Sequence, residues 1–211
     1  MIWIIAPPLL CLGVCLPMFM YWKSAAKYTL AAMYKAAGTL CALIPALVVA
    51  IRLDPHCWIC AAGILLCAAG DYLLEFSTLL GGGFFLAGHI CYIAFLAHLF
   101  PVSAVQVICL GVFVGIMVYT FYKNKTLIGK QLPVYAVYGV ILSVMSAFAV
   151  GALSSGSLHG ILIACGGALF FVSDYILLHR TLYTAGKAVS WIIMITYYAA
   201  QLLFGISCLY I

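Results

Sequence analysis

The chain has 211 residues, of which 68% are hydrophobic and only 6% are charged. A soluble protein of this size could not bury so much apolar surface, so the composition excludes the soluble classes and indicates a polytopic membrane protein. The formal net charge of +5 comes from lysines and arginines between apolar segments, which favours contact with anionic lipid and excludes a nucleic-acid partner.

Apolar segments follow one another along the whole chain. A spanning helix needs about 20 apolar residues to cross a hydrocarbon core of about 30 Å, and helices satisfy their own backbone polar groups there. The chain is predicted to be an all-α, polytopic transmembrane helical bundle in a single domain, residues 1–211, because the connections are too short for another domain. The eight predicted spans are residues 2–22, 30–51, 57–76, 82–100, 102–122, 132–153, 157–179 and 188–210.

The first segment lacks the positive start of a signal peptide, since Lys23 and Lys27 follow its apolar run. With eight spans, only Arg52 falls at one end of the bundle. All the other lysines and arginines fall at the opposite end: Lys23, Lys27, Lys35, Lys123, Lys125, Lys130, Arg180 and Lys187. This excess predicts that the basic end is cytoplasmic and that both termini are external.

Two segments resemble each other: GDYLLEF at 70–76 and SDYILLH at 173–179. They lie four predicted helices apart, so they cross the membrane in the same direction. This indicates two four-helix halves, 1–100 and 101–211, related as a parallel repeat. Between the third and fourth spans, Gly81–Gly83 is expected to form a tight turn.

Rare polar residues converge near the basic end. Counting from the predicted span ends at 1.5 Å per residue places Asp71, His89 and Asp174 roughly 8–9 Å inside. An ionisable group in the membrane costs about 2.5–3.5 kcal/mol, so it faces the bundle interior and finds a partner. Each residue alone could simply join helices by hydrogen bonds, but two acids and a histidine together favour a functional site. Further candidates near this level are Lys35, Glu75, Tyr92, Tyr197 and Gln201.

One short stretch carries residues of metal-ligand type, His56-Cys57-Trp58-Ile59-Cys60, near the external end of the third span. A structural zinc site needs four ligands, and no second Cys/His pair lies nearby in the sequence. We therefore expect no metal there. Most other cysteines lie within spans, where they behave as small apolar residues.

Four motifs resemble, in order along nearly the full chain, the YhhN-like lysoplasmalogenase family. They are Gly70-Asp71-x-x-Leu74, Gly88-His89-x-x-Tyr92, Ser173-Asp174 and Thr196-Tyr197-Tyr198-x-x-Gln201. The resemblance implies an integral membrane hydrolase that cleaves the sn-1 vinyl-ether bond of lysoplasmalogens. The products are a fatty aldehyde and glycerophosphoethanolamine or glycerophosphocholine. Lys35 also resembles a family position, but without the Lys-Pro pairing expected there.

The residues suit this chemistry, because a vinyl ether resists bases and nucleophiles but is cleaved by acid. Such a reaction needs a placed general acid, an anion facing the developing cation and an activated water. The paired aspartates Asp71 and Asp174 would supply acid and anion, in an order that the sequence leaves open, and His89 would orient the water or one of the carboxylates. No metal or other cofactor is needed.

The remaining candidates are expected to bind the substrate. Lys35 would contact the lipid phosphate, and hydroxyl and amide groups would serve the ether oxygen or the glycerol: Tyr92, Tyr197 and Gln201. Glu75 is either a substrate-binding residue or the solvated end of its helix. The expected partners are the lysophospholipid substrate and membrane lipid. The headgroup, ethanolamine or choline, and the oligomeric state stay open.

Other functions compete with this interpretation. A proton-coupled transporter of lipids or small molecules could use the aspartate pair as a proton relay. An intramembrane aspartyl protease would carry Gly-x-Gly-Asp, whereas residues 68–71 read Ala-Ala-Gly-Asp. A zinc-dependent lipid amidase would need several clustered histidines. The short loops favour a bacterial cytoplasmic (inner) membrane as the location.

Overall fold

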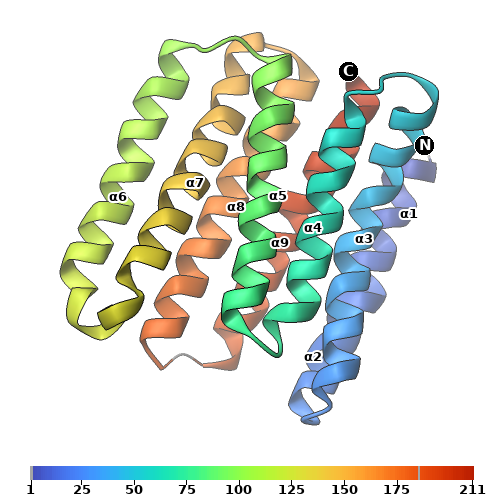
Figure 1. Cartoon of the computed structure of the whole chain (residues 1–211). Helices are drawn as coiled ribbons and strands as arrows, with labels where there is room; N and C mark the ends of the chain where they lie inside the picture. Colours follow the sequence, from blue (N-terminus) through green and yellow to red (C-terminus); the bar gives the residue numbers. More distant parts are fainter. Residues whose placement is uncertain (1, 185) are drawn as a thin grey trace.

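The computed structural model describes residues 2–184 and 186–211, and in this part of the chain helices account for nearly all of the structure (Figure 1). The all-α membrane bundle predicted from the sequence is confirmed. Its helices are α1 (Ile2–Leu10), α2 (Leu16–Ser24), α3 (Tyr28–Arg52), α4 (Cys57–Leu74), α5 (Thr78–Leu99), α6 (Ala104–Ile128), α7 (Leu132–Gly151), α8 (Leu158–Leu182) and α9 (Lys187–Ser207).

Seven uninterrupted stretches of the described chain are long and apolar enough to cross a membrane. The first joins α1 and α2 through a π-helical turn, Cys11–Cys15. Another, Ala104–Ser155, is 52 residues long and contains the fifth and sixth predicted spans. At Gly129 φ is 58°, and the chain reverses there so that α6 and α7 lie antiparallel (Figure 1). The eight predicted segments are therefore all helical.

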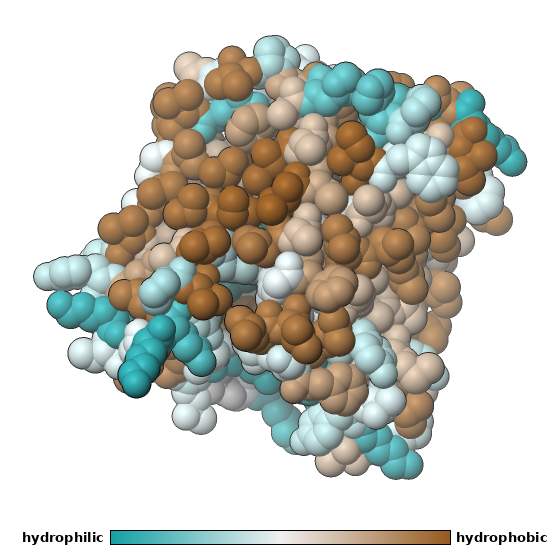
Figure 2. Space-filling model, in the orientation of Figure 1, coloured by the Kyte–Doolittle hydropathy of each residue, from teal (hydrophilic) through white to brown (hydrophobic). Residues whose placement is uncertain are grey.

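The helices form one closed bundle. Along the chain α3, α4 and α5 pack side by side, α5 contacts α7, and α7, α8 and α9 follow. Helix α9 also packs against α3, which closes the ring, while α6 covers α7 and the first helix covers α3. Both termini lie at the same end of the bundle (Figure 1). A broad apolar band separates more hydrophilic ends (Figure 2), as expected for a protein that spans a bilayer.

Two predicted helix boundaries are wrong by one helical turn or more. Helix α6 continues to Ile128 rather than ending at 122, so Lys123 and Lys125 are helical. Helix α5 begins at Thr78 rather than 82, because Ser77 is its N-cap and accepts a hydrogen bond from the Leu80 amide at 3.3 Å.

Gly81–Gly83 therefore do not form the expected turn, since they lie in the first turns of α5. Gly81 permits a close approach of two helices instead. A Cβ atom added to it would lie 2.7 Å from the backbone of Leu74, at the end of α4. The glycine thus brings α5 against α4 beside Asp71.

Candidate active site

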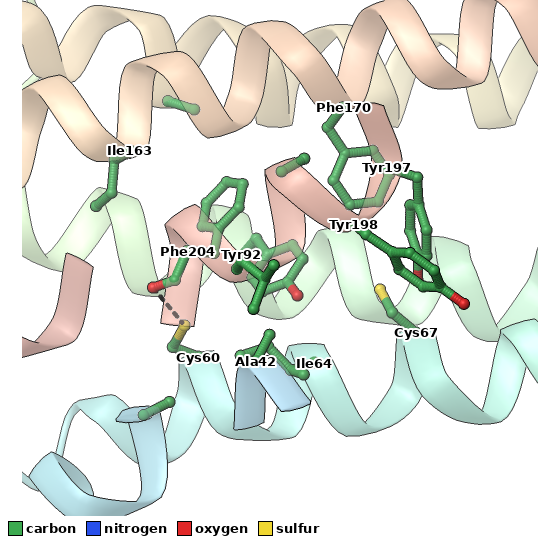
Figure 3. Packing of buried hydrophobic residues seen from close by; sticks show 14 of the residues in the cluster. Ala42, Cys60, Ile64, Cys67, Tyr92, Ile163, Phe170, Tyr197, Tyr198 and Phe204 are labelled. Atoms are coloured by element: carbon green, nitrogen blue, oxygen red, sulfur yellow. Dashed lines mark hydrogen bonds between the residues drawn. The ribbon is translucent and has the colours of Figure 1, made fainter. Parts of the chain in front are cut away.

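Three helices each present two polar side chains, four residues apart, to the interior at the basic end of the bundle. Residues with this spacing share one face of a helix. The pairs are Lys35 and Thr39 on α3, Asp71 on α4 with Glu75 at the C-cap of that helix, and Tyr197 and Gln201 on α9. Their neighbours are apolar and aromatic, and Figure 3 shows Tyr197 packed near Phe170 and Cys67 in this interior.

Asp71 is almost completely buried, with 1% of its surface exposed. Its Oδ2 accepts hydrogen bonds from the Thr39 hydroxyl at 2.5 Å and from the Tyr197 hydroxyl at 2.7 Å. Its Oδ1 lies 3.5 Å from Nζ of Lys35. Every partner is a hydrogen-bond donor and one is a cation, which is the environment that an ionised carboxylate requires in an apolar interior.

A second row of hydrogen bonds fixes the direction of the Tyr197 hydroxyl. Tyr92 donates to Oε1 of Gln201 at 2.5 Å, so the Gln201 amide group turns its Nε2 toward Tyr197, at 3.3 Å. Tyr197 then accepts from the amide and directs its own hydrogen to Asp71. The ring of Tyr92 fits beside Gly63, where an added Cβ would lie 2.7 Å from it. The predicted residues Tyr92, Tyr197 and Gln201 thus act together on Asp71.

Asp174, on α8, has a poorer set of partners. Its Oδ2 accepts a hydrogen bond from the hydroxyl of Tyr138, on α7, at 2.6 Å. Within residues 2–184 and 186–211, no cation lies at ion-pair distance from it, and no hydrogen bond joins it to Asp71. Desolvation without a compensating charge favours the neutral form of a carboxyl group, whose carbonyl oxygen still accepts a hydrogen bond.

His89 packs among aromatic rings, one of which belongs to the hydrogen-bond partner of Asp174. Its ring meets that of Tyr138 at a centroid distance of 5.5 Å and that of Phe170 at 4.8 Å, and Phe170 in turn lies 5.5 Å from Tyr197. The side chain is fully buried, and neither ring nitrogen has a hydrogen-bond partner among the described residues. A buried imidazole with two unpaired nitrogens is suited to bind a water molecule or a substrate atom.

The expected single level of the three residues is wrong for His89. Because α5 begins four residues earlier than predicted, His89 lies about 6 Å farther from the basic end of the bundle than the sequence count gave. Gly88 accordingly packs against Cys67, one turn of α4 deeper than Asp71.

An alternating row of charges leads from Asp71 toward the basic end. Lys35 lies 3.5 Å from both Asp71 and Glu75, and Nζ of Lys23 contacts both Glu75 oxygens at 2.9 and 2.8 Å. Only 5% of the Glu75 side chain and 7% of the Lys35 side chain are exposed. Neither is a solvated helix end, which excludes that alternative for Glu75.

The histidine and cysteines near the opposite end do not join this site. His56 pairs with Asp54 at 2.8 Å and stacks on His98, with ring centroids 3.7 Å apart. Hydrogen bonds from the backbone amide and the ring of His56 hold the pKa of the Asp54 carboxyl below its usual value. Among the described residues, no three His, Cys, Asp or Glu side chains are grouped so that they could hold a metal ion.

Four residues of this site were not predicted. Thr39 is an ordinary member of an apolar span in the sequence, Lys23 is one of several lysines expected at the basic end, and Phe170 is one of many aromatic residues in the spans. The sequence spacing could have indicated Tyr138, because Tyr138 precedes Asp174 by 36 residues and Lys35 precedes Asp71 by the same number. The repeat proposed from the two aspartate segments would have aligned these two positions.

A shallow hollow lies elsewhere, against the outer faces of α4 and α5. It has a volume of about 260 Å³, and its lining is Leu66, Leu79, Leu80, Gly83, Phe84 and Ala87. None of these residues belongs to the polar network. Its apolar lining suits a lipid chain, but it offers no chemistry.

Sequence comparisons bear on the whole chain. A model of the YhhN family matches residues 9–208. No curated protein and no solved structure matches the sequence. The match includes both aspartates, His89 and every other residue of the polar network described above.

Proposed function

The chain belongs to the YhhN family, and we propose that it is a lysoplasmalogenase of the membrane. In this proposal it hydrolyses the sn-1 vinyl-ether bond of a lysoplasmalogen to a fatty aldehyde and a glycerophosphodiester. The resemblance of its ordered motifs to lysoplasmalogenases supports this activity. The observation that carries the proposal is the unequal pairing of two buried carboxyl groups, one beside a lysine and one beside a phenol.

The two environments divide the work that acid cleavage needs. We assign the general acid to Asp174, since its position favours a protonated carboxyl group. Its proton goes to the outer alkene carbon, whose π electrons form the new C–H bond. The inner carbon and the ether oxygen then share a positive charge as an oxocarbenium ion. Asp71, held as an anion by Lys35, stabilises this cation electrostatically.

Water completes the reaction. One nitrogen of His89 accepts a hydrogen bond from a water molecule, which adds to the cationic carbon and passes a proton to the Asp174 carboxylate. In the resulting hemiacetal, the C–O bond to glycerol breaks as the glycerol oxygen takes the proton from Asp174, and the hemiacetal hydroxyl passes its own proton to the Asp174 carboxylate, which restores the starting acid. One water is consumed, Asp174 acts as acid and then as base in each half of the reaction, and the aldehyde leaves.

The substrate enters with its headgroup toward the basic end. Lys35 would pair with the phosphate there, and the alkenyl chain would extend into the apolar part of the bundle or the membrane. If the basic end is cytoplasmic, as the charge distribution predicts, the reaction takes place in the inner half of the membrane, which we assign to a bacterial cytoplasmic membrane.

The test is aldehyde release by the purified protein in detergent, with 1-alkenyl and 1-acyl lysophospholipids side by side. We expect turnover of the alkenyl lipid only, because an ester needs a nucleophile at a carbonyl and this chain has no Gly-x-Ser-x-Gly nucleophile motif. Comparable turnover of both lipids would contradict the acid mechanism. Substrate flux in liposomes without aldehyde release would favour the proton-coupled transporter.

A further inference from the structure

The Glu75 carboxylate lies where a negative charge needs positively charged partners. Glu75 caps the C-terminal end of α4, where the helix dipole disfavours a negative charge, and its side chain is almost completely buried. Two lysines, Lys23 and Lys35, compensate its negative charge, and they differ in solvent exposure. Lys35 is itself buried, whereas 32% of the Lys23 side chain is exposed. Lys23 is therefore the partner that can leave without unfolding the bundle.

The ammonium group of Lys23 is bound in a definite way. Its Nζ contacts both carboxylate oxygens of Glu75, at 2.9 and 2.8 Å, and lies 5.3 Å from the centre of the Phe19 ring. Phe19 is buried, with 3% exposed. A carboxylate on one side and an aromatic face on the other form a site for a small cation.

This cation site is in register with the proposed reaction centre. Along α3, Lys35 is one turn nearer the basic end than Thr39, and along α4, Glu75 is one turn nearer than Asp71. One turn is about 5.4 Å. Moving outward, the order is the carboxylate of Asp71, the ammonium of Lys35 and the carboxylate of Glu75. A lysophospholipid presents, in the same direction, its ether, its phosphate and its amine.

We infer that Glu75 and Phe19 form the headgroup subsite for a primary ammonium, which Lys23 occupies in the structure and which phosphoethanolamine occupies when substrate binds. This inference rests on the proposed function and specifies its substrate class. The lipid amine takes the place of Lys23 Nζ on Glu75, and the released Lys23 turns to the surrounding water and lipid phosphates.

The geometry selects ethanolamine over choline. A primary ammonium donates N–H groups to both Glu75 oxygens, as Lys23 does. A trimethylammonium has no N–H to donate and is held instead by cages of several aromatic rings, of which Phe19 supplies one. Methylation would also separate the positive charge from the carboxylate.

The experiment measures binding of saturated 1-O-alkyl lysophospholipids, which lack the vinyl ether and cannot react by the proposed route. Three headgroups are compared on the same alkyl chain: phosphoethanolamine, phosphocholine and phosphate alone. Dissociation constants are determined by titration calorimetry with the purified full-length protein in detergent. For the unchanged chain we expect the ethanolamine lipid to bind about tenfold more tightly than either of the others.

Two variants separate this site from a simple phosphate site. Lys23→Met removes the internal competitor, so the ethanolamine lipid should bind more tightly, by about threefold to tenfold, with little change for phosphate alone. Lys23→Met/Glu75→Gln, which keeps the charges balanced, should bind all three lipids alike. Lys27→Met, at an exposed lysine in the connection between α2 and α3, is the matched control and should leave all three constants unchanged.

The inference is overturned if the unchanged chain binds the three headgroups equally. It is also overturned if Lys23→Met weakens the binding of all three lipids, since that result would mean that Lys23 binds the phosphate group. Neither result affects the proposed hydrolysis, because an enzyme that cleaves both headgroups equally retains its function without the ammonium subsite. Conversely, selective binding of the ethanolamine lipid without aldehyde release would contradict the proposed hydrolase activity and support the ammonium subsite.

Discussion

Asp71 and Asp174 occupy related places in the sequence but opposite environments in the fold. Each follows a small residue, precedes tyrosine and contacts a residue 36 positions earlier in the chain. For Asp71 that residue is Lys35, a cation, and for Asp174 it is Tyr138, a neutral phenol. Asp71 has three donors around its oxygens, whereas Asp174 has one among the described residues.

The difference teaches that the partner, rather than the acid, sets the charge in an apolar interior. Desolvation disfavours both carboxylates, and the ammonium of Lys35 compensates only one of them. The equal spacing is what duplication of a four-helix unit, 1–100 and 101–211, would produce. The duplication itself stays a prediction. If it occurred, replacing a lysine by a tyrosine at one position would convert a pair of like acids into an acid and an anion.

The largest effect is expected for Asp174→Asn. Asparagine keeps the shape and a hydrogen bond with Tyr138 but cannot deliver a proton, so aldehyde release should fall by about 10³–10⁴-fold. The melting temperature in detergent should stay within a few degrees of the unchanged chain, because no buried charge loses its partner. A correctly folded variant that keeps most of its activity would make Asp174 a residue that only joins helices.

Asp71→Asn should cost nearly as much activity, about 10²–10³-fold, through loss of the stabilising anion. Unlike Asp174→Asn, it should also lower the melting temperature, because Lys35 then loses one of the two buried counterions that it has among the described residues. Equal melting temperatures for the two single variants would contradict the unequal charges. The double variant should be little worse than the worse single one, because the two carboxyl groups act as a unit.

Lys35→Met/Asp71→Asn separates stability from catalysis at the same place. Removing both charges leaves no unpaired ion, so the double variant should melt closer to the unchanged chain than Asp71→Asn does, and it should remain inactive. Thermal melting and aldehyde release on the same preparations check this. If the double variant melts lower than Asp71→Asn, the pair is not a compensating one.

His89→Gln should have a milder effect, about tenfold to a hundredfold, because orienting a water is easier to replace than donating a proton. The variant keeps a hydrogen-bonding group at a fully buried position beside Tyr138 and Phe170. Steady-state aldehyde release measures the effect, and an unchanged kcat would remove His89 from the reaction.

The smallest effects are expected for the two phenols that contact the carboxyl groups. Tyr138→Phe leaves Asp174 without its hydrogen bond from Tyr138, whereas Tyr197→Phe leaves Asp71 with Thr39 and Lys35. We expect about a tenfold loss of kcat for Tyr138→Phe and about a threefold loss for Tyr197→Phe, since single hydrogen bonds contribute about 0.5–1.5 kcal/mol. The reverse order would contradict the comparison.

Much of the site was predictable because its residues are exceptions to the composition. A carboxyl group or a histidine in an apolar span is rare enough to be noticed one at a time, as Asp71, His89 and Asp174 were. Thr39, Tyr138 and Phe170 were not noticed because such residues are common in membrane helices. Their importance comes only from what they contact. For Glu75 the sequence leaves both a buried position and a solvated helix end open, because nothing local indicates that Lys23 covers it.

The sequence by itself determined the class of fold and the number of apolar segments, because hydropathy is a sum over neighbouring residues and a span needs only length and apolar character. It also determined which end carries the positive charge. The tertiary structure decided which carboxyl group pairs with a cation, which with a phenol, and which lysine can leave. Those contacts join residues 36 or 52 positions apart. Such residues meet only when the helices pack, so local patterns do not contain the contacts.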